Sequence, residues 1–284
     1  MTTRFAQVII GPAGSGKSTY IANAKKHFDD IKRIVHCVNL DPAADSLPYD
    51  PEIDIREAID IKDIMQKQKL GPNGALVFCL ESVAMQSKWF DEVIGEHEYD
   101  YLLIDMPGQI ELYSHLTVLP ELLSNLTHKG YSLIMVFLVD AQFLSDPGKF
   151  LSTSLVALST MTMLELPHIN VISKCDLLPE EDLKKIDDFT EMETFALMDR
   201  IKPNSTIAEL TNKICELIDT FRLVQFRMLN LKEEDSLSDL IQSIDMIIQY
   251  YENADYGDEE FHEVADEEGD YSDLIELREG PPPF

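Results

Sequence analysis

Cysteine is scarce in this 284-residue chain, and its four copies stand far apart in the sequence. They are Cys37, Cys79, Cys175 and Cys215. Without close pairs they match neither the ligand spacing of a zinc site nor the density of a disulfide scaffold. We therefore expect buried or free thiols in a reducing compartment.

Long hydrophobic runs are also missing. The longest, residues 133–139, is far shorter than the roughly 20 residues that a membrane-spanning helix requires. The chain reaches Gly11 after one short apolar stretch, which leaves no room for the successive parts of a secretory signal. We therefore expect no membrane span, no secretion and a cytoplasmic location.

Positive charge is in short supply. Lysine and arginine number 23 against 52 aspartate and glutamate, which gives a net charge of −29. Nucleic acids and anionic membranes are bound through basic patches, so we expect no direct binding to either. Residues 252–284 hold 13 acidic side chains and one arginine, a composition that predicts a disordered acidic tail.

Apolar or β-branched runs alternate with segments of helical periodicity. The predicted strands are residues 5–10, 33–40, 99–105, 132–140, 168–173 and 223–226. This alternation predicts an α/β fold with a mostly parallel sheet and helices on both faces. We expect one P-loop NTPase domain over residues 1–251, with a helical insertion at about 180–220, followed by the tail 252–284.

The stretch "GPAGSGKS", residues 11–18, matches the P-loop pattern G-x-x-x-x-G-K-[ST] between a predicted strand and a helix. Backbone N–H groups of such a loop surround phosphates, while Lys17 neutralises their charge and the Ser18 hydroxyl reaches Mg²⁺. The alternative is a glycine-rich turn with a surface lysine. The predicted nucleotide-binding residues here are Pro12, Ala13, Gly14, Ser15, Gly16, Lys17, Ser18 and Thr19.

The stretch "DMPGQIE", residues 105–111, follows another predicted strand and resembles the D-x-x-G switch of GTPases. Asp105 is expected to hold Mg²⁺ directly or through water, and the Gly108 N–H to sense the γ-phosphate. Gln109 and Glu111 are candidates to orient water or to support that network. The alternative is a strand-end aspartate before a simple Pro-Gly turn.

The stretch "SKCD" places Lys174 and Asp176 in the K-x-D spacing of a guanine-recognition loop. A carboxylate can accept from both N–H donors of guanine, whereas adenine has no such donor pair on that edge. The Lys174 stem can cover one face of the base, with Leu177 nearby. Ser173 stands where GTPases usually have asparagine, so we expect weaker base affinity than in small signalling GTPases.

Two further stretches lie at predicted strand ends or turns. "NLDPAA" leaves Asp41 at the end of a strand, where it can polarise the attacking water, join the metal ligands or merely cap a turn. Gly71, Pro72 and Asn73 form a turn-like tripeptide, because proline fixes φ and asparagine favours turns. Local chemistry alone indicates an ordinary loop between helices.

In the order in which they occur along the chain, these five stretches resemble the motifs of the GPN-loop GTPases, and the resemblance covers about residues 4–250. The acidic tail and the overall sequence look most like the third eukaryotic paralogue of that family. The resemblance implies a GTP-hydrolysing switch that binds GTP or GDP with Mg²⁺. It also implies a dimer in which Gly71, Pro72 and Asn73 of one subunit enter the active site of the other, with Asn73 near the phosphate that is cleaved.

The resemblance further implies a homodimer, or a heterodimer with a paralogous GPN-loop GTPase. It implies assistance in RNA polymerase II assembly and nuclear import, with polymerase subunits or import factors as partners and shuttling to the nucleus. Two alternatives stay open. One is a dimeric P-loop ATPase, although this chain has Pro12 and Ala13 where that class has an extra lysine. The other is a GTP-binding assembly scaffold with negligible hydrolysis.

Overall fold

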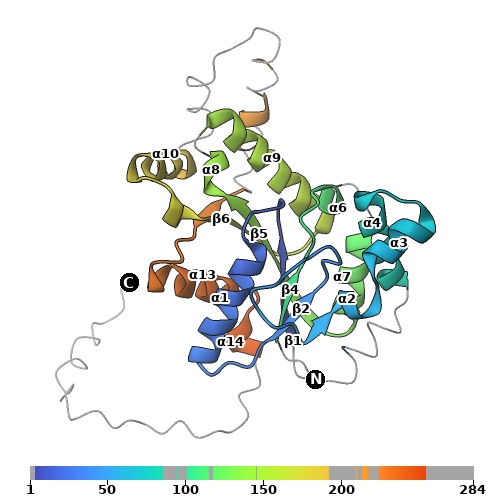
Figure 1. Ribbon diagram of the computed structural model, residues 1–284. Helices are drawn as coiled ribbons and strands as arrows, with labels where there is room; N and C mark the ends of the chain where they lie inside the picture. Colours follow the sequence, from blue (N-terminus) through green and yellow to red (C-terminus); the bar gives the residue numbers. More distant parts are fainter. Residues whose placement is uncertain are drawn as a thin grey trace, which may run out of the picture. The chain divides into compact units, whose positions relative to one another are not determined.

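A computed structural model describes residues 4–85, 94, 101–114, 118–144, 146–191, 209, 213–216, 218 and 224–253. Its centre is a parallel sheet in the strand order β3-β2-β4-β1-β5-β6-β7 (Figure 1). The strands are β1 Arg4–Ile10, β2 His36–Asn39, β3 Ile53–Asp54, β4 Tyr101–Asp105, β5 Tyr131–Asp140, β6 His168–Ser173 and β7 Phe226–Met228. The predicted α/β class and parallel sheet are thereby confirmed.

Helices cover both faces of this sheet. They are α1 Lys17–Asp30, α2 Ile55–Ala58, α3 Ile61–Gln68, α4 Pro72–Met85, α6 Glu111–Ser114, α7 Val118–His128, α8 Ala141–Leu144, α9 Pro147–Leu164, α10 Glu180–Glu191, α13 Glu234–Ile247 and α14 Tyr250–Asn253. A one-turn 3₁₀ helix, η1, spans Cys175–Leu177. Among the helices described, none is long and apolar enough to cross a membrane.

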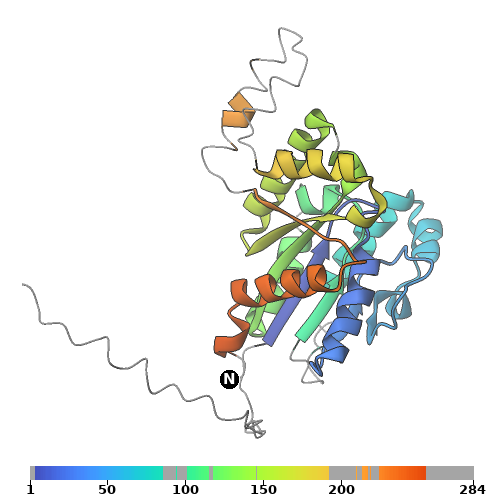
Figure 2. The same cartoon turned by 90° about the vertical axis from the view of Figure 1, so that its left-hand side faces the viewer.

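The two faces of the sheet bury separate apolar clusters. Ala6, Val8 and Ile10 of β1 pack with α4, α6, α7, α8 and α9. Phe5 and Ile9 point to the opposite face and pack with α1 and α13, which lie against each other there (Figure 2). Because successive side chains of a strand alternate between faces, the nearly continuous apolar run of β1 reflects burial on both sides.

Several element boundaries differ from the prediction. β3 has only two residues at the edge of the sheet and was missed, because so short a strand leaves no periodic pattern. β2 begins at His36 instead of residue 33, and β7 begins at Phe226, so the prediction of strand is wrong for residues 224 and 225, while residue 223 lies outside the described residues. Glu252 and Asn253 were assigned to the tail but end α14. The rest of the predicted tail lies outside the described residues.

The predicted helical insertion falls partly on described residues. α10 occupies its first part, and the described positions between 209 and 218 are helical. Its remaining positions lie outside the described residues.

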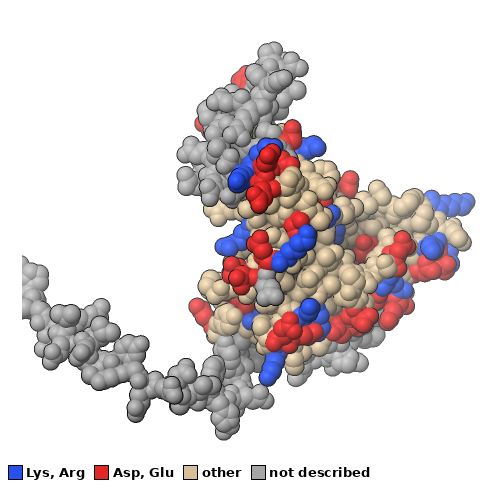
Figure 3. Space-filling model, turned by 60° about the vertical axis from the view of Figure 1, so that its left-hand side comes forward, with Lys and Arg blue, Asp and Glu red and all other residues tan. Residues whose placement is uncertain are grey.

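On the face drawn in Figure 3, basic side chains are interspersed with acidic ones.

The carboxyl ends of the strands meet at one edge of the sheet. β1 lies between β4 and β5, with Ile9 opposite Asp105 and Ile10 opposite Phe137. The chain leaves β1 toward one face and reaches its two neighbours through separate crossovers, so their loops open around the end of β1. The P-loop, Asp105 and the "SKCD" stretch are therefore neighbours in space.

Candidate functional site

The P-loop has the strand, loop and helix context that its sequence predicts. β1 ends at Ile10, and α1 begins at Lys17 after the N-cap Gly16. Gly11 has a φ of 142°, and a Cβ there would lie 2.1 Å from the Leu138 carbonyl oxygen. Only glycine permits this close approach between the loop and β5, so the loop conformation depends on Gly11.

The Lys17 side chain reaches back to the loop that precedes it. Its Nζ donates to the carbonyl oxygens of Gly11 at 3.1 Å and Pro12 at 3.2 Å. Burial lowers the pKa of Lys17, and the nearby carboxylates of Asp105 and Asp41 partly offset this. The loop thus holds an ammonium group beside two acidic residues, as a site for phosphate and metal requires.

Asp105 ends β4 beside the start of α1. Its carboxylate accepts hydrogen bonds from the Ser18 hydroxyl and from the Tyr49 hydroxyl, the latter at 2.9 Å. Burial raises the pKa of Asp105, and these two hydrogen bonds offset part of the rise. Ser18 and Asp105 offer the oxygen ligands that Mg²⁺ prefers, so the pair fits that ion. Within the described residues no group of three or more His, Cys, Asp or Glu could hold a metal.

The loop after Asp105 packs directly on the P-loop. A Cβ on Gly108 would lie 2.6 Å from Ala13 Cα and 2.8 Å from Ala13 N, so a side chain there would separate the two loops. Gln109 is half-buried, and Glu111 is exposed at the start of α6. Tyr113 of α6 is fully buried, with its hydroxyl at the Gly11 backbone.

One buried polar atom in the P-loop indicates what the loop binds. Ser15 is 1% exposed, and its Oγ has no hydrogen-bond partner within the part of the chain that the structure describes. Buried hydroxyl groups in proteins are normally paired. A phosphate oxygen accepts hydrogen bonds and would satisfy this donor, in agreement with the predicted role of the loop.

A cavity of about 240 Å³ opens beside the P-loop. Its lining comes from the end of the P-loop, from α1, from β5, from the end of β6 and from the segments that follow β6 and β7: Gly16, Thr19, Tyr20, Leu138, Ser173, Lys174, Asp176, Leu177, Leu229 and Leu231. The predicted base-recognition residues therefore share one cavity with the end of the P-loop. Its position and its mixed polar and apolar lining suit a nucleobase.

Ser173 links this cavity to the P-loop. It is 4% exposed, and its Oγ lies 2.6 Å from the Ser15 carbonyl oxygen and 2.9 Å from that of Val139. A hydroxyl carries one hydrogen, so it donates to one of these oxygens at a time. The serine that replaces the usual asparagine thus still ties the base-recognition loop to the phosphate-binding loop.

Two charged partners of the K-x-D pair were not anticipated from the sequence. Lys174 Nζ donates to Asp140 Oδ2 at 2.7 Å, and Lys232 Nζ lies 3.6 Å from Asp176 Oδ2. Asp140 ends an apolar strand, which is a signal that could have marked it. Lys232 follows β7 at a distance in sequence that no motif spacing specifies.

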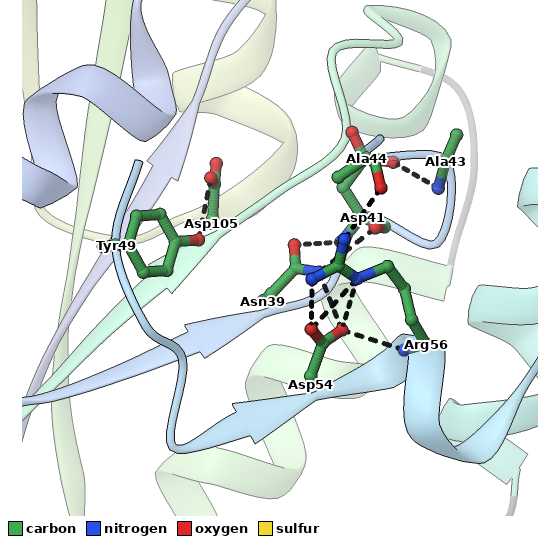
Figure 4. Close-up of polar contacts among 8 residues, drawn as sticks. All are labelled: Asn39, Asp41, Ala43, Ala44, Tyr49, Asp54, Arg56 and Asp105. Carbon is green, nitrogen blue, oxygen red and sulfur yellow. Dashed lines mark hydrogen bonds and ion pairs between the residues drawn. The ribbon is translucent and has the colours of Figure 1, made fainter. Parts of the chain in front are cut away.

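Asp41 lies in a loop that joins β2 to β3 (Figure 4). Asn39 Oδ1 accepts a hydrogen bond from Asp41 N at 3.1 Å, and Asn39 Nδ2 donates to Asp54 Oδ1 at 2.9 Å. Burial raises the pKa of Asp41, and the Ala43 N–H together with two nearby cations offsets part of the rise. Asn39, Asp54, Arg56 and Tyr49 were not predicted as site residues.

The Gly-Pro-Asn tripeptide lies at a helix start. Pro72 is the first residue of α4, and the Gly71 carbonyl oxygen accepts from Ala75 N at 2.9 Å, so the tripeptide opens a helix instead of forming an isolated turn. Gly71, Pro72 and Asn73 are all exposed. Among the described residues, no hydrogen bond or ion pair joins Asn73 to the P-loop.

Comparisons with known proteins agree with this geometry. A family model described as "Conserved hypothetical ATP binding protein" matches residues 9–250. GPN-loop GTPase 3 of Dictyostelium discoideum is 42% identical over 88% of this chain and 89% of its own length, and that of Xenopus tropicalis is 41% identical over 95% of both chains.

A solved structure matches as well. The crystal structure of a GTPase in apo form from Pyrococcus abyssi has a TM-score of 0.73 and 28% identity, and it covers 87% of this chain and 97% of that one. The relatives carry the name of the third paralogue, which confirms the resemblance inferred from the motifs. The chain belongs to the GPN-loop GTPase family.

Proposed function

We propose that the chain binds GTP with Mg²⁺ and hydrolyses it to GDP and phosphate. The observation that carries this proposal is the cavity that Asp176 and Gly16 both line. A nucleotide whose base is bound at Asp176 would extend its phosphates from this cavity along the P-loop. The names of the relatives support the same activity.

Asp176 supports guanine over adenine. Its carboxylate can accept from the ring N–H and the exocyclic amine of guanine, whereas adenine would leave it unpaired. The ion pair with Lys232 and the hydrogen bond between Lys174 and Asp140 hold the two recognition residues in place. Leu177, which is 58% exposed, adds apolar surface at the rim.

The phosphate end of the site supports hydrolysis. Lys17 and the backbone N–H groups of the P-loop bind the phosphates, and Ser18 and Asp105 would hold Mg²⁺, which supplies positive charge against the phosphate oxygens. Asp41 accepts a hydrogen bond from the attacking water, whose oxygen bonds to the γ-phosphorus as the bond to the leaving GDP oxygen breaks. The proton that the water loses passes to an oxygen of the released phosphate. Gln109 and Glu111 remain candidates for orienting that water.

Asn73 supports a shared active site. It is exposed and stands at the N-terminus of α4, where a second chain can contact it. The proposed dimer is formed with a second copy or with a paralogous GPN-loop GTPase. A role in cytoplasmic assembly and nuclear import of RNA polymerase II, with shuttling to the nucleus, rests on family resemblance alone. Its partners would be polymerase subunits or import factors.

The exposure of Asn73 also leaves room for a second function. If no partner brings an amide to the γ-phosphate, the chain acts as a GTP-binding scaffold with negligible hydrolysis. Single-turnover GTP cleavage, measured with and without a paralogous partner, distinguishes the two. Cleavage in either condition supports the GTPase, whereas binding without cleavage in both supports the scaffold.

Lys17→Ala tests the nucleotide site itself. Removal of the buried ammonium should abolish tight GTP binding, because no other cation of the P-loop can neutralise the phosphates. The measurement is a titration with GTP and, in parallel, with ATP, to separate a GTPase from an ATPase. Lys26→Ala, at an exposed position of the same helix, is the control. Unchanged GTP affinity in Lys17→Ala would refute the site.

A further inference from the structure

The loop of residues 41–44 has little packing to hold its shape. Ala43 is exposed, Asp41 and Ala44 are partly exposed, and Pro42 alone of the four is buried. A segment with so few buried contacts opens easily unless hydrogen bonds restrain it. The hydrogen bonds at its two ends therefore govern where Asp41 lies.

Arg56 supplies the hydrogen bond at the far end of this loop. From the first turn of α2, its Nη1 donates to the Ala44 carbonyl oxygen at 2.9 Å (Figure 4). Asp54 holds the other side of the same guanidinium, with Nε at 2.9 Å and Nη2 at 2.5 Å from Oδ2. A planar guanidinium can make both sets of bonds at once, whereas a lysine ammonium is a single point of charge.

Asp54 is itself fixed in place. Its Oδ1 accepts from Arg56 N at 2.9 Å, which caps α2, and from Asn39 Nδ2 at 2.9 Å. Burial raises the pKa of Asp54, but the hydrogen bonds from Arg56 and Asn39 outweigh it and lower the pKa below its ordinary value. The carboxylate is therefore ionised at neutral pH and provides a fixed anchor for Arg56.

Asp41 has one oxygen engaged and one free. Its Oδ1 accepts from Ala43 N at 2.9 Å, while no described residue donates to Oδ2. The neighbouring Leu40 N donates to the Asp105 carbonyl oxygen at 2.9 Å, so Asp41 lies next to the end of β4, and its carboxylate acts electrostatically on both Lys17 and Asp105. Asp41 is therefore at the phosphate end of the site. Its free oxygen can accept a hydrogen bond there only while the loop keeps its present shape.

We propose that Arg56 is a positioning residue for GTP hydrolysis, which clamps the Ala44 carbonyl and so holds the Asp41 carboxylate at the phosphate end of the site. The proposal rests on the proposed function and names a residue on which that reaction depends. Arg56 acts through Asp41 and touches no reacting atom. Its effect falls on the cleavage step, because the P-loop and the base cavity bind GTP without it.

Arg56→Lys is the first test. Lysine keeps a positive charge beside Asp54 but cannot bond Asp54 and Ala44 together as the guanidinium does. We expect single-turnover GTP cleavage to slow about tenfold or more, because small misplacements of a reacting group have effects of that size. The dissociation constant for GTP should change less than about threefold by the same argument, since the loop adds no phosphate contact.

Arg56→Ala with added guanidinium ion gives a second readout. The truncation leaves a space beside the anionic Asp54 that fits a free guanidinium ion. Millimolar guanidinium should restore cleavage severalfold in this variant and should leave the wild-type rate unchanged. A residue that only stabilised the fold would not respond in this way at temperatures where the variant is already folded.

Arg33→Lys is the matched control. Arg33 also pairs with an aspartate, because its Nη1 donates to both oxygens of Asp245 at 2.9 and 2.8 Å, but it lies against α13 and α14 instead of the Asp41 loop. We expect this variant to lose thermal stability and to keep its cleavage rate. The same change in the same kind of ion pair then has no specific effect on hydrolysis.

The proposal would be overturned if Arg56→Lys cleaved GTP at the rate of the wild-type chain. So would a parallel loss of cleavage, GTP affinity and thermal stability without guanidinium rescue, since that pattern marks a structural role. Slower cleavage with retained affinity supports it. A wild-type chain that binds GTP and never cleaves it would instead overturn the proposed hydrolysis, and the clamp with it.

Discussion

The pKa values of single side chains at the phosphate end depend on burial and on the charges of neighbouring side chains. Burial lowers the pKa of Lys17, whereas it raises the pKa of Asp41 and of Asp105. Each shift disfavours the charged form, and the opposite charges nearby oppose it. A bound nucleotide with its metal adds further charges of both signs, so the protonation of these groups is linked to nucleotide binding.

His168 gives a residue-scale prediction remote from the nucleotide. It starts β6, both ring nitrogens are buried without a hydrogen-bond partner in the described chain, and burial lowers its pKa to about 4. The unfolded chain has the ordinary pKa of 6.5, so it takes up this proton first as pH falls. The free energy of unfolding therefore loses up to about 3 kcal/mol between pH 6.5 and 4 through this group.

His168→Gln removes that contribution. Urea unfolding at pH 7 and pH 4 should show a smaller loss of stability at the lower pH in the variant, by about 3 kcal/mol at most. His128→Gln, at an exposed position at the end of α7, controls for the loss of an imidazole. Equal losses in the wild type and in His168→Gln would contradict the prediction.

At the level of elements, loops that follow different strands meet the P-loop through a few close contacts. Ser173, at the end of β6, bonds the backbone of the P-loop and of β5. Gly108, after β4, contacts Ala13 of the P-loop. These two contacts couple the base-recognition loop and the switch loop to the same phosphate-binding loop. We therefore expect a change in one of the three to affect the others.

Ser173→Ala tests this coupling. The substitution removes the one hydrogen bond that the hydroxyl donates to a buried carbonyl oxygen, at a cost of about 1–3 kcal/mol. Part of that cost should appear in GTP binding, as a loss of affinity of about tenfold. Isothermal titration measures the affinity, and urea unfolding measures the cost in stability.

Ser154→Ala is the matched control for this prediction. Ser154 is also buried, at 2% exposed, and its Oγ donates to Phe150 O one turn earlier in α9. Its removal should leave GTP affinity unchanged, because the bond is local to that helix. An equal loss of affinity in both variants would show that Ser173 acts through general stability alone.

At the scale of the whole molecule, the described chain holds a nucleotide pocket but does not bring Asn73 to it. The tripeptide opens α4, whose inner residues Leu76 and Leu80 pack in the core on the face opposite α1. α4 is therefore a rigid support that presents Asn73 outward. A second chain is the simplest means of supplying this amide to a phosphate.

Asn73→Ala tests the shared site. GTP affinity and the stability of the single chain should stay near wild type, because the side chain is exposed and makes no bond to the P-loop. Single-turnover cleavage in the assembled dimer should fall about tenfold or more, as when one charge-stabilising donor is removed. Solution mass with a non-hydrolysable GTP analogue establishes the assembly state.

Asn125→Ala, on the half-buried side of α7, is the control for that variant. It lies beside Ser124 and Ala84, near the end of α4 opposite Asn73, and should leave cleavage unchanged. Normal cleavage by Asn73→Ala, or a large loss of GTP affinity in it, would contradict a role for this residue in trans.

Much of the fold and of the site follows from local sequence. The P-loop is predicted from its glycine-rich pattern directly after a strand that ends at Ile10. The structure explains the first glycine, because the φ of 142° at Gly11 and the close approach to Leu138 permit no side chain. Asp105 and Asp176 are likewise found from their place after apolar strands. In each case the signal lies within a few residues, where backbone geometry and periodicity are written directly in the chain.

The partners of these residues depend on register and crossover connections, which short sequence patterns do not encode. Asp54 meets Asn39 because β3 pairs with β2 in one register, and Arg56 reaches Ala44 because α2 starts at that point. Lys232 meets Asp176, 56 positions earlier, only after β7 has joined β6. Local chemistry thus identifies the groups that meet phosphate and base, while the long-range packing of the sheet determines which side chains hold them in place.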